Sequence, residues 1–316
     1  MTLRRLAARA GLLAGAGLLA TRRRIDARAA RAEASHPPEG RMLDLGGQRL
    51  HVVERGAGPD LVLIHGASGS SRDFSLSLID RLAARFRVLA FDRPGFGHSD
   101  PLPGHGLREQ ADLLAAGAAS LGAARPLLLG QSYGGAVAMT WAEALPAAGL
   151  VTVSAPLLPW PGALDPWYRA NAHPLPRKLL VPLAAAFVPE SYVARQLAAV
   201  FAPDPVPPGY LAHLGMDLTL RAGQLAVNVA QINALHGELT RAAPRWPGLS
   251  LPVDLLHGTA DSIVPASIHA IPLAPRIPGA VLTLLEGVGH MPHHARPDAV
   301  IAAILRAASR AGLPIS

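Results

Sequence analysis

Eight short apolar runs, most of them separated by longer segments with helical character, constrain the fold of this chain more than any other feature. The middle runs are continuously apolar, which is the pattern of strands covered on both faces. The runs cover residues 41–45, 50–54, 61–65, 88–92, 127–130, 150–154, 253–257 and 281–286. This alternation predicts an α/β fold with an eight-stranded, mostly parallel sheet and helices on both of its faces.

The connections between the runs predict how the chain is divided. Gly46-Gly47 separates the first two runs and is typical of a tight hairpin, so the sheet is expected to open with an antiparallel pair. Residues 156–247, between the sixth and seventh runs, are far too many for an ordinary crossover and predict an inserted helical cap. Residues 42–155 and 248–316 are then expected to form the core.

Composition excludes several classes of function. The formal net charge is +7, but residues 1–41 contain nine Arg against three acidic residues, and the remaining 275 residues carry 20 basic and 19 acidic side chains. That remainder lacks a stripe of basic residues mixed with aromatics, so nucleic acid is not an expected partner. The chain has no cysteine, which excludes disulfides, thiolate metal sites and a cysteine nucleophile and leaves the compartment open.

The amino-terminal arm, residues 1–41, allows several interpretations. Its apolar run at residues 10–20 is shorter than the roughly 20 residues that span a bilayer. The basic start and the Ala-Arg-Ala sequence at residues 27–29 favour a signal peptide and export. The arginines at residues 22–24 favour an anchor that holds residues 1–24 on the surface of the inner membrane. A disordered basic tail and a cytoplasmic location stay open, and the prolines within residues 36–40 predict a linker.

The segment Gly130-Gln131-Ser132-Tyr133-Gly134 stands where the fifth run ends and a helical segment begins. A serine on so tight a turn from strand to helix projects its hydroxyl outward, and the glycines leave room for neighbouring backbone. The amino terminus of the helix also points N–H groups at an oxyanion formed there. Ser132 is therefore the candidate nucleophile.

A serine nucleophile needs a histidine to take its proton and a carboxylate to orient that histidine. Asp261 follows the seventh run and His290 follows the eighth, so each candidate lies just past a strand end. Asp254 is a weaker candidate, because it lies inside the seventh run and would point away from the site or need a buried partner. The order along the chain is serine, acid, histidine.

On these residues, the chain from about residue 42 to 311 resembles an α/β-hydrolase-fold enzyme. The resemblance implies that Ser132 attacks the substrate, that His290 transfers protons and that Asp261 orients His290. The sequence Ile-His-Gly-Ala at residues 64–67 is similar to the oxyanion loop of the family. The similarity implies that the backbone N–H groups of Ala67 and Tyr133 bind the oxyanion. A second family-like loop, residues 92–100, receives no chemical role.

Four other histidines compete with His290. His293 and His294 lie where the last helix begins, so a supporting or surface role is expected for each. His65 and His257 end strands and are expected to orient loops through hydrogen bonds. No histidine cluster has the carboxylate spacing of a known metal motif, so neither a metal nor another cofactor is expected.

The identity of the nucleophile limits the reaction. Related dehalogenases and epoxide hydrolases carry a carboxylate at the position of Ser132, whereas a serine forms an acyl-enzyme with esters, thioesters, some amides or cleavable diketones. Gln131 stands where many family esterases carry His, which leaves the subfamily open. Trp160, Trp167 and Tyr168 follow the sixth run and are expected to line an apolar acyl pocket.

The expected function is that of a metal-independent serine hydrolase acting on a small, apolar ester. Two alternatives of the same fold are a carbon–carbon bond hydrolase and a cofactor-free perhydrolase. An alternative from another class is a ligand receptor that keeps the fold without turnover. The sequence carries no signal for the oligomeric state.

Overall fold

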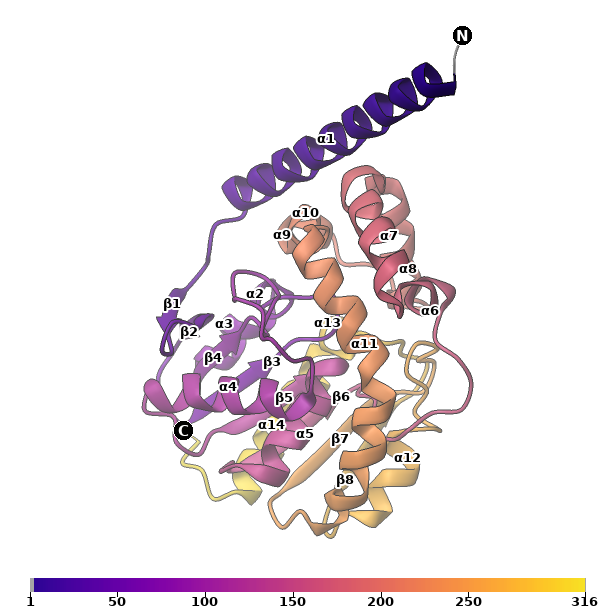
Figure 1. The fold of residues 1–316 in the computed structure, drawn as a ribbon. Coiled ribbons are helices and arrows are strands. Elements are labelled where there is room, and N and C mark those ends of the chain that lie inside the picture. Colours follow the sequence, from indigo (N-terminus) through magenta and orange to yellow (C-terminus); the bar gives the residue numbers. More distant parts are fainter. Residues whose placement is uncertain (1–2, 316) are drawn as a thin grey trace.

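The structure, a computed structural model, describes the backbone of residues 3–315 and the side chains of residues 15–315. Its centre is one eight-stranded sheet in the order β1-β2-β4-β3-β5-β6-β7-β8 (Figure 1). The strands are β1 Arg41–Asp44, β2 Arg49–Arg55, β3 Asp60–Ile64, β4 Arg87–Phe91, β5 Leu127–Gln131, β6 Gly149–Val153, β7 Val253–Gly258 and β8 Val281–Leu285. The predicted α/β fold with eight strands is confirmed.

The sheet is mostly parallel, as predicted. β2 runs antiparallel to both β1 and β4, and every other pair of neighbours is parallel. The hairpin between β1 and β2 turns at Gly46 and Gly47, whose φ angles are +71° and +91°. Two successive positive φ angles are the requirement of a tight hairpin turn, which explains the glycine pair.

Helices cover both faces of the sheet. They are α1 Leu3–Ser35, α2 Arg72–Ser75, α3 Leu78–Ala83, α4 Leu107–Ser120, α5 Tyr133–Ala144, α6 Pro166–Asn171, α7 Pro174–Phe187, α8 Glu190–Phe201, α9 Tyr210–Leu214, α10 Met216–Thr219, α11 Ala222–Ala242, α12 Ala270–Leu273, α13 Pro292–Ala295 and α14 Pro297–Arg310, with short 3₁₀ helices at Ala243–Gly248 and Ala274–Arg276. Val62 and Ile64 of β3 pack in the layer that contains α4 and α5, whereas Leu61 and Leu63 pack in the layer of α3 and α14. Burial on both faces explains the continuously apolar runs.

Helices α6 to α11 all lie between β6 and β7 in the chain. Figure 1 shows α7 to α10 beyond one edge of the core, above the strands in that view, and α11 running from them down alongside the core. Prolines begin α6 and α7, and Gly209 and Gly215 flank α9 with positive φ angles, so the chain changes direction often. This arrangement supports the proposed division into a core and an inserted cap at residues 156–247.

Helix α1 ends at Ser35, directly before the predicted linker, and its second half packs on α7 and α10 of the cap. The Arg28 guanidinium donates to the carbonyl oxygens of Ala185 (3.1 Å) and Val188 (3.2 Å) and pairs with Asp217 (2.6 Å). The Ala-Arg-Ala sequence therefore lies inside a helix that is docked on the cap. No helix in the part of the chain that the structure describes is long and apolar enough to cross a membrane.

We expect Arg28→Ala to loosen the docking of α1. The change removes an ion pair and leaves two carbonyls at the end of α7 without their donor. Amide hydrogen exchange within residues 15–35 should quicken by about tenfold or more, while exchange in β5 stays unchanged. Arg22→Ala, at an exposed position of the same helix, is the control. Equal exchange in both variants would contradict this role of Arg28.

Candidate active site

Ser132 occupies a strained turn between β5 and α5. Its backbone has φ 49° and ψ −125°, a conformation that residues with a side chain rarely adopt. A Cβ atom added to Gly130 would lie 2.3 Å from the Gly134 carbonyl oxygen, and one added to Gly134 would lie 2.1 Å from the Ile64 oxygen. Both glycines are therefore needed for the backbone to pack this closely.

The three residues expected to form a triad lie in one hydrogen-bonded chain. His290 Nε2 is 3.0 Å from Ser132 Oγ, and His290 Nδ1 is 2.8 Å from Asp261 Oδ2. The other carboxylate oxygen of Asp261 accepts the backbone N–H groups of Ile263 (2.9 Å) and Val264 (2.8 Å). Burial alone would raise the pKa of Asp261, but hydrogen bonds from His257 and His290 outweigh it and lower this pKa. Asp261 is therefore an ionised acceptor that faces His290.

The residues expected to bind an oxyanion are placed beside Ser132. Tyr133 is the first residue of α5, so its N–H points out of the helix end. A Cβ added to Gly66 would lie 3.1 Å from the Ser132 Cβ, so the loop that contains Ala67 runs directly against the serine. Within the described residues, the N–H groups of Ala67 and Tyr133 have no backbone acceptor. Both are thus free to donate.

Several buried side chains hold the loops that carry these groups. His257 Nε2 donates to the Val264 carbonyl oxygen at 2.6 Å and so braces the loop of Asp261. His65 Nε2 accepts the backbone N–H of Arg93 at 2.9 Å. The Gln131 amide nitrogen lies 3.5 Å from the carbonyl oxygen of His290, which ties the strand end to the histidine loop. Gln131, directly before Ser132, thus helps to hold the loop of His290 in place.

Asp254 is committed to another part of the structure. Its carboxylate is buried and forms ion pairs with Arg306 and, at 3.1 Å, with Arg310, both on α14. The partners of this buried aspartate are therefore two partly exposed arginines.

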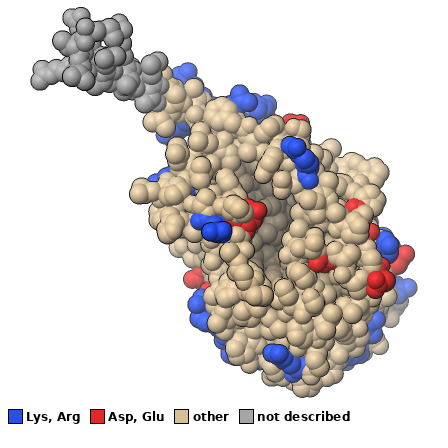
Figure 2. Space-filling model, turned by 90° about the vertical axis from the view of Figure 1, so that its right-hand side faces the viewer, with Lys and Arg blue, Asp and Glu red and all other residues tan. Residues whose placement is uncertain are grey.

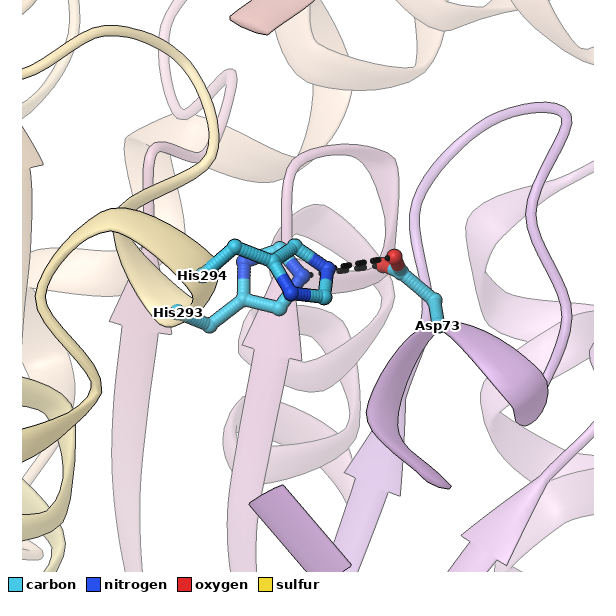
Figure 3. Close-up of side chains that lie close together, drawn as sticks. All are labelled: Asp73, His293 and His294. Carbon is cyan, nitrogen blue, oxygen red and sulfur yellow. Dashed lines mark hydrogen bonds and ion pairs between the residues drawn. The ribbon is translucent and has the colours of Figure 1, made fainter. Parts of the chain in front are cut away.

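His293 and His294 converge on Asp73, which the sequence analysis did not single out. Figure 3 shows both rings pointing their Nε2 atoms at the carboxylate, each at 3.0 Å. The Tyr210 hydroxyl, from the cap, donates to the same carboxylate at 2.6 Å. Burial alone would raise the pKa of Asp73, but the two histidines outweigh it and hold this pKa well below its usual value.

Asp73, His293 and His294 also have ligand atoms within 4.8 Å of one another, a spacing that a divalent cation could use. Two features favour hydrogen bonding instead. Tyr210 already occupies one carboxylate oxygen. The buried Nδ1 of His293 has no partner among the described residues, although a metal-bound imidazole normally donates that N–H. We therefore interpret the cluster as a tie between the core and the cap.

The three predicted pocket residues differ in their surroundings. The Tyr168 hydroxyl accepts a hydrogen bond from the Asn228 amide at 3.3 Å, and the oxygen of that amide accepts the Ser68 N–H at 3.0 Å. Tyr168 is thus one step from the loop of Ala67. Trp160 packs edge-on against His236, with 5.1 Å between ring centres, and Trp167 is half-buried on α6. Asn228 was missed because it lies in the middle of a long helix.

A hollow opens on one face of the molecule. Figure 2 shows it near the centre of that face, surrounded mostly by uncharged side chains, with a basic and an acidic side chain at its edge. Largely uncharged surroundings favour an uncharged ligand, because burying an unpaired charge is costly.

The sheet order and the position of Ser132 after β5 define the architecture of α/β hydrolases. Residues 61–303 match the model of the alpha/beta hydrolase family, and the chain belongs to this family. It is 30% identical over 290 residues to haloalkane dehalogenase 2 of Mycobacterium bovis, covering 85% of this chain and 95% of the dehalogenase. It is 32% identical over 258 residues to polyketide synthase ThaQ of Burkholderia thailandensis, covering 78% of this chain but 11% of the synthase.

Comparison with solved structures gives the same fold. The esterase RhEst1 of Rhodococcus sp. ECU1013 superposes with a TM-score of 0.64 at 27% identity, covering 85% of this chain and 98% of the esterase. The names of these proteins refer to different chemistries. Family membership therefore supports a hydrolase with a small-molecule substrate and leaves the substrate to the site.

We expect the free energy of unfolding to fall as the pH drops from 6.5 to 4. Burial lowers the pKa of His65 and of His269 to about 4, so the unfolded chain binds protons in this range that the folded chain does not. Each histidine should contribute a slope of up to about 1.4 kcal/mol per pH unit. Urea unfolding at pH 7 and pH 5 measures the difference.

His269→Gln should make this pH dependence shallower, because it removes one of the buried groups whose pKa is lowered. His173→Gln, at an exposed position, serves as the control and should keep the slope of the unchanged protein. A free energy that stays constant between pH 7 and pH 5 would refute the assignment.

Proposed function

We propose that this protein is a metal-independent serine hydrolase that cleaves an apolar carboxylic ester through an acyl-enzyme. The observation that carries the proposal is the continuous hydrogen-bonded chain from Ser132 Oγ through His290 to Asp261. In this arrangement the Ser132 oxygen attacks the ester carbonyl while His290 Nε2 takes its proton and then delivers it to the departing alcohol. Water, activated by the same histidine, then hydrolyses the acyl-enzyme.

An uncharged acyl group agrees with the state of the acidic residues in the cap. Asp165 accepts the N–H of Trp167, Asp204 accepts the N–H of Gly289, Asp217 pairs with Arg28, Glu238 pairs with Arg241, and Glu190 is exposed at the start of α8. All of these carboxylates except that of Glu190 therefore already have a hydrogen-bond or ion-pair partner. A cap without a free buried carboxylate offers no counter-ion for an amine, which favours an apolar substrate.

Arg93 holds the backbone of the proposed oxyanion loop through buried hydrogen bonds. Its guanidinium is fully buried and donates to the carbonyl oxygens of His65 (2.9 Å) and Gly66 (3.0 Å), directly before Ala67. It also lies 4.4 Å from the centre of the Tyr133 ring. Burial lowers the pKa of Arg93 to about 10, so the group stays charged at neutral pH. Its Nη1 group donates to the side-chain oxygens of Gln110 (2.8 Å) and Gln231 (2.6 Å), and no carboxylate of the described residues pairs with it.

Because its charge has no ionic partner, we expect Arg93 to hold the oxyanion loop and to favour negative charge on the substrate oxygen. Arg93→Met should lower kcat for a soluble ester by about a hundredfold and change KM much less. Arg93→Lys, which keeps the charge, should recover part of the loss. Circular dichroism confirms folding, and a folded Arg93→Met variant with normal kcat would contradict this role.

We expect Ser132→Ala to abolish ester hydrolysis and labelling by a fluorophosphonate, because no acyl-enzyme can form. We expect kcat to fall by about a millionfold and to leave only the slow hydrolysis that substrate binding and the oxyanion donors still promote. Ser154→Ala is a matched control, since Ser154 is also buried after a strand with a positive φ of 47°. The unchanged protein should keep its activity in the presence of a chelator.

A set of p-nitrophenyl esters of increasing acyl length measures both activity and preference. Turnover by Ser132→Ala would show that another residue is the nucleophile. Binding of a small ligand by a chain that neither turns over an ester nor reacts with the fluorophosphonate would favour a receptor.

A further inference from the structure

The large apolar side chains that stay exposed gather on one part of the molecule. Among the residues with described side chains, seven of the eleven lie on α1, on α7 or at the start of α8. They are Leu18, Leu19, Leu175, Leu179, Leu183, Phe187 and Tyr192, with exposed fractions between 41% and 81%. Such a concentration on one surface is typical of an interaction site.

Helix α7 has two apolar faces. Leu175, Leu179, Leu183 and Phe187 recur every fourth residue and form an exposed stripe along the helix. Other residues of α7, such as Val181 and Ala185, are buried inside the cap. Packing of the cap thus explains one face of this helix and leaves the exposed leucines without a role in the fold.

Helix α1 meets one end of this stripe. The Arg24 guanidinium donates to the Ala186 carbonyl oxygen at 2.7 Å and lies 5.2 Å from the centre of the Phe187 ring. The exposed Leu18 and Leu19 precede Arg24 on the same helix by less than two turns. Figure 1 shows the amino-terminal part of α1 extending past the cap.

The charge of this surface has one predominant sign. Residues 166–189, which include α6 and α7, contain Arg169, Arg177 and Lys178 and no acidic residue. Arg22 and Arg23 are exposed on α1 one turn after Leu19, and residues 1–25 have no acidic residue. Leucines next to arginines and lysine form the combination that inserts shallowly into a bilayer with anionic headgroups.

We propose that the exposed leucine stripe of α7 and residues 15–23 of α1 together dock on the surface of an anionic lipid bilayer. This proposal rests on the proposed function and makes the ester a lipid. The helix α6 packs on α7 and carries Tyr168, which reaches the oxyanion loop through Asn228. Helix α6 therefore connects the proposed docking surface to the loop beside Ser132.

Vesicle sedimentation with the full chain tests the surface. We expect binding to vesicles with equal parts of phosphatidylglycerol and phosphatidylcholine and much weaker binding to phosphatidylcholine alone. Leu175→Ser combined with Leu179→Ser should weaken binding to the anionic vesicles by about tenfold or more. Met42→Ser combined with Leu284→Ser, two exposed apolar residues on β1 and β8, should bind as the unchanged protein does.

Activity separates this proposal from the proposed function. The α7 double variant should keep normal kcat/KM on a soluble short-chain ester and lose hydrolysis of an ester carried in the vesicles. If the unchanged protein hydrolyses no ester, the proposed function fails, and vesicle binding still decides the docking surface. Equal vesicle binding by the α7 double variant and the unchanged protein would overturn the proposal. The same result together with loss of a dimer in light scattering would instead assign the stripe to contact between two copies.

Discussion

The close approach of three backbone segments beneath Ser132 is the constraint on which the site depends. Gly130 and Gly134 allow the end of β5 and the start of α5 to pack within a distance that any side chain would prevent. Gly134 also lies against the end of β3, and therefore against the loop that follows it. One set of glycines thus places the nucleophile, the end of α5 and the oxyanion loop beside one another.

Buried polar groups then hold the remaining loops around this point. Asp261 receives two backbone N–H groups, His257 braces the same loop, and Arg93 fastens the carbonyls before Ala67. Each of these groups is buried and hydrogen-bonded, so moving a loop would leave a polar group without a partner. These buried hydrogen bonds therefore fix the positions of the two loops, although neither loop has regular secondary structure.

The cap is joined to the core by contacts of the same kind. Tyr210 donates to Asp73, which also holds His293 and His294 only a few residues after His290. Asp204 accepts the N–H of Gly289 at 2.8 Å, directly before His290. The proposed base is therefore fixed by residues from both parts of the chain. A substitution in the cap can therefore alter the position of His290 through these hydrogen bonds, even where the substituted residue does not contact the substrate.

The predictable part of the structure depended on local patterns. The continuously apolar middle runs predicted their strands almost to the residue, since burial on both faces favours apolar side chains at nearly every position. Gly46-Gly47 predicted the hairpin because the turn needs two positive φ angles. Asp73, Asn228 and Gln231 were not predictable in this way, because each one acts on a residue far away in the sequence, and no local pattern marks such a contact.

The sequence by itself determined the class of fold, the strands and the order of Ser132, Asp261 and His290, because periodicity and turn chemistry are local properties of the chain. Only the tertiary structure decided that these three side chains lie within hydrogen-bonding distance. It also decided that the buried Arg93 pairs with carbonyl and glutamine oxygens and that the leucines of α7 face outward. These features depend on which segments pack together, and packing is a property of the whole molecule.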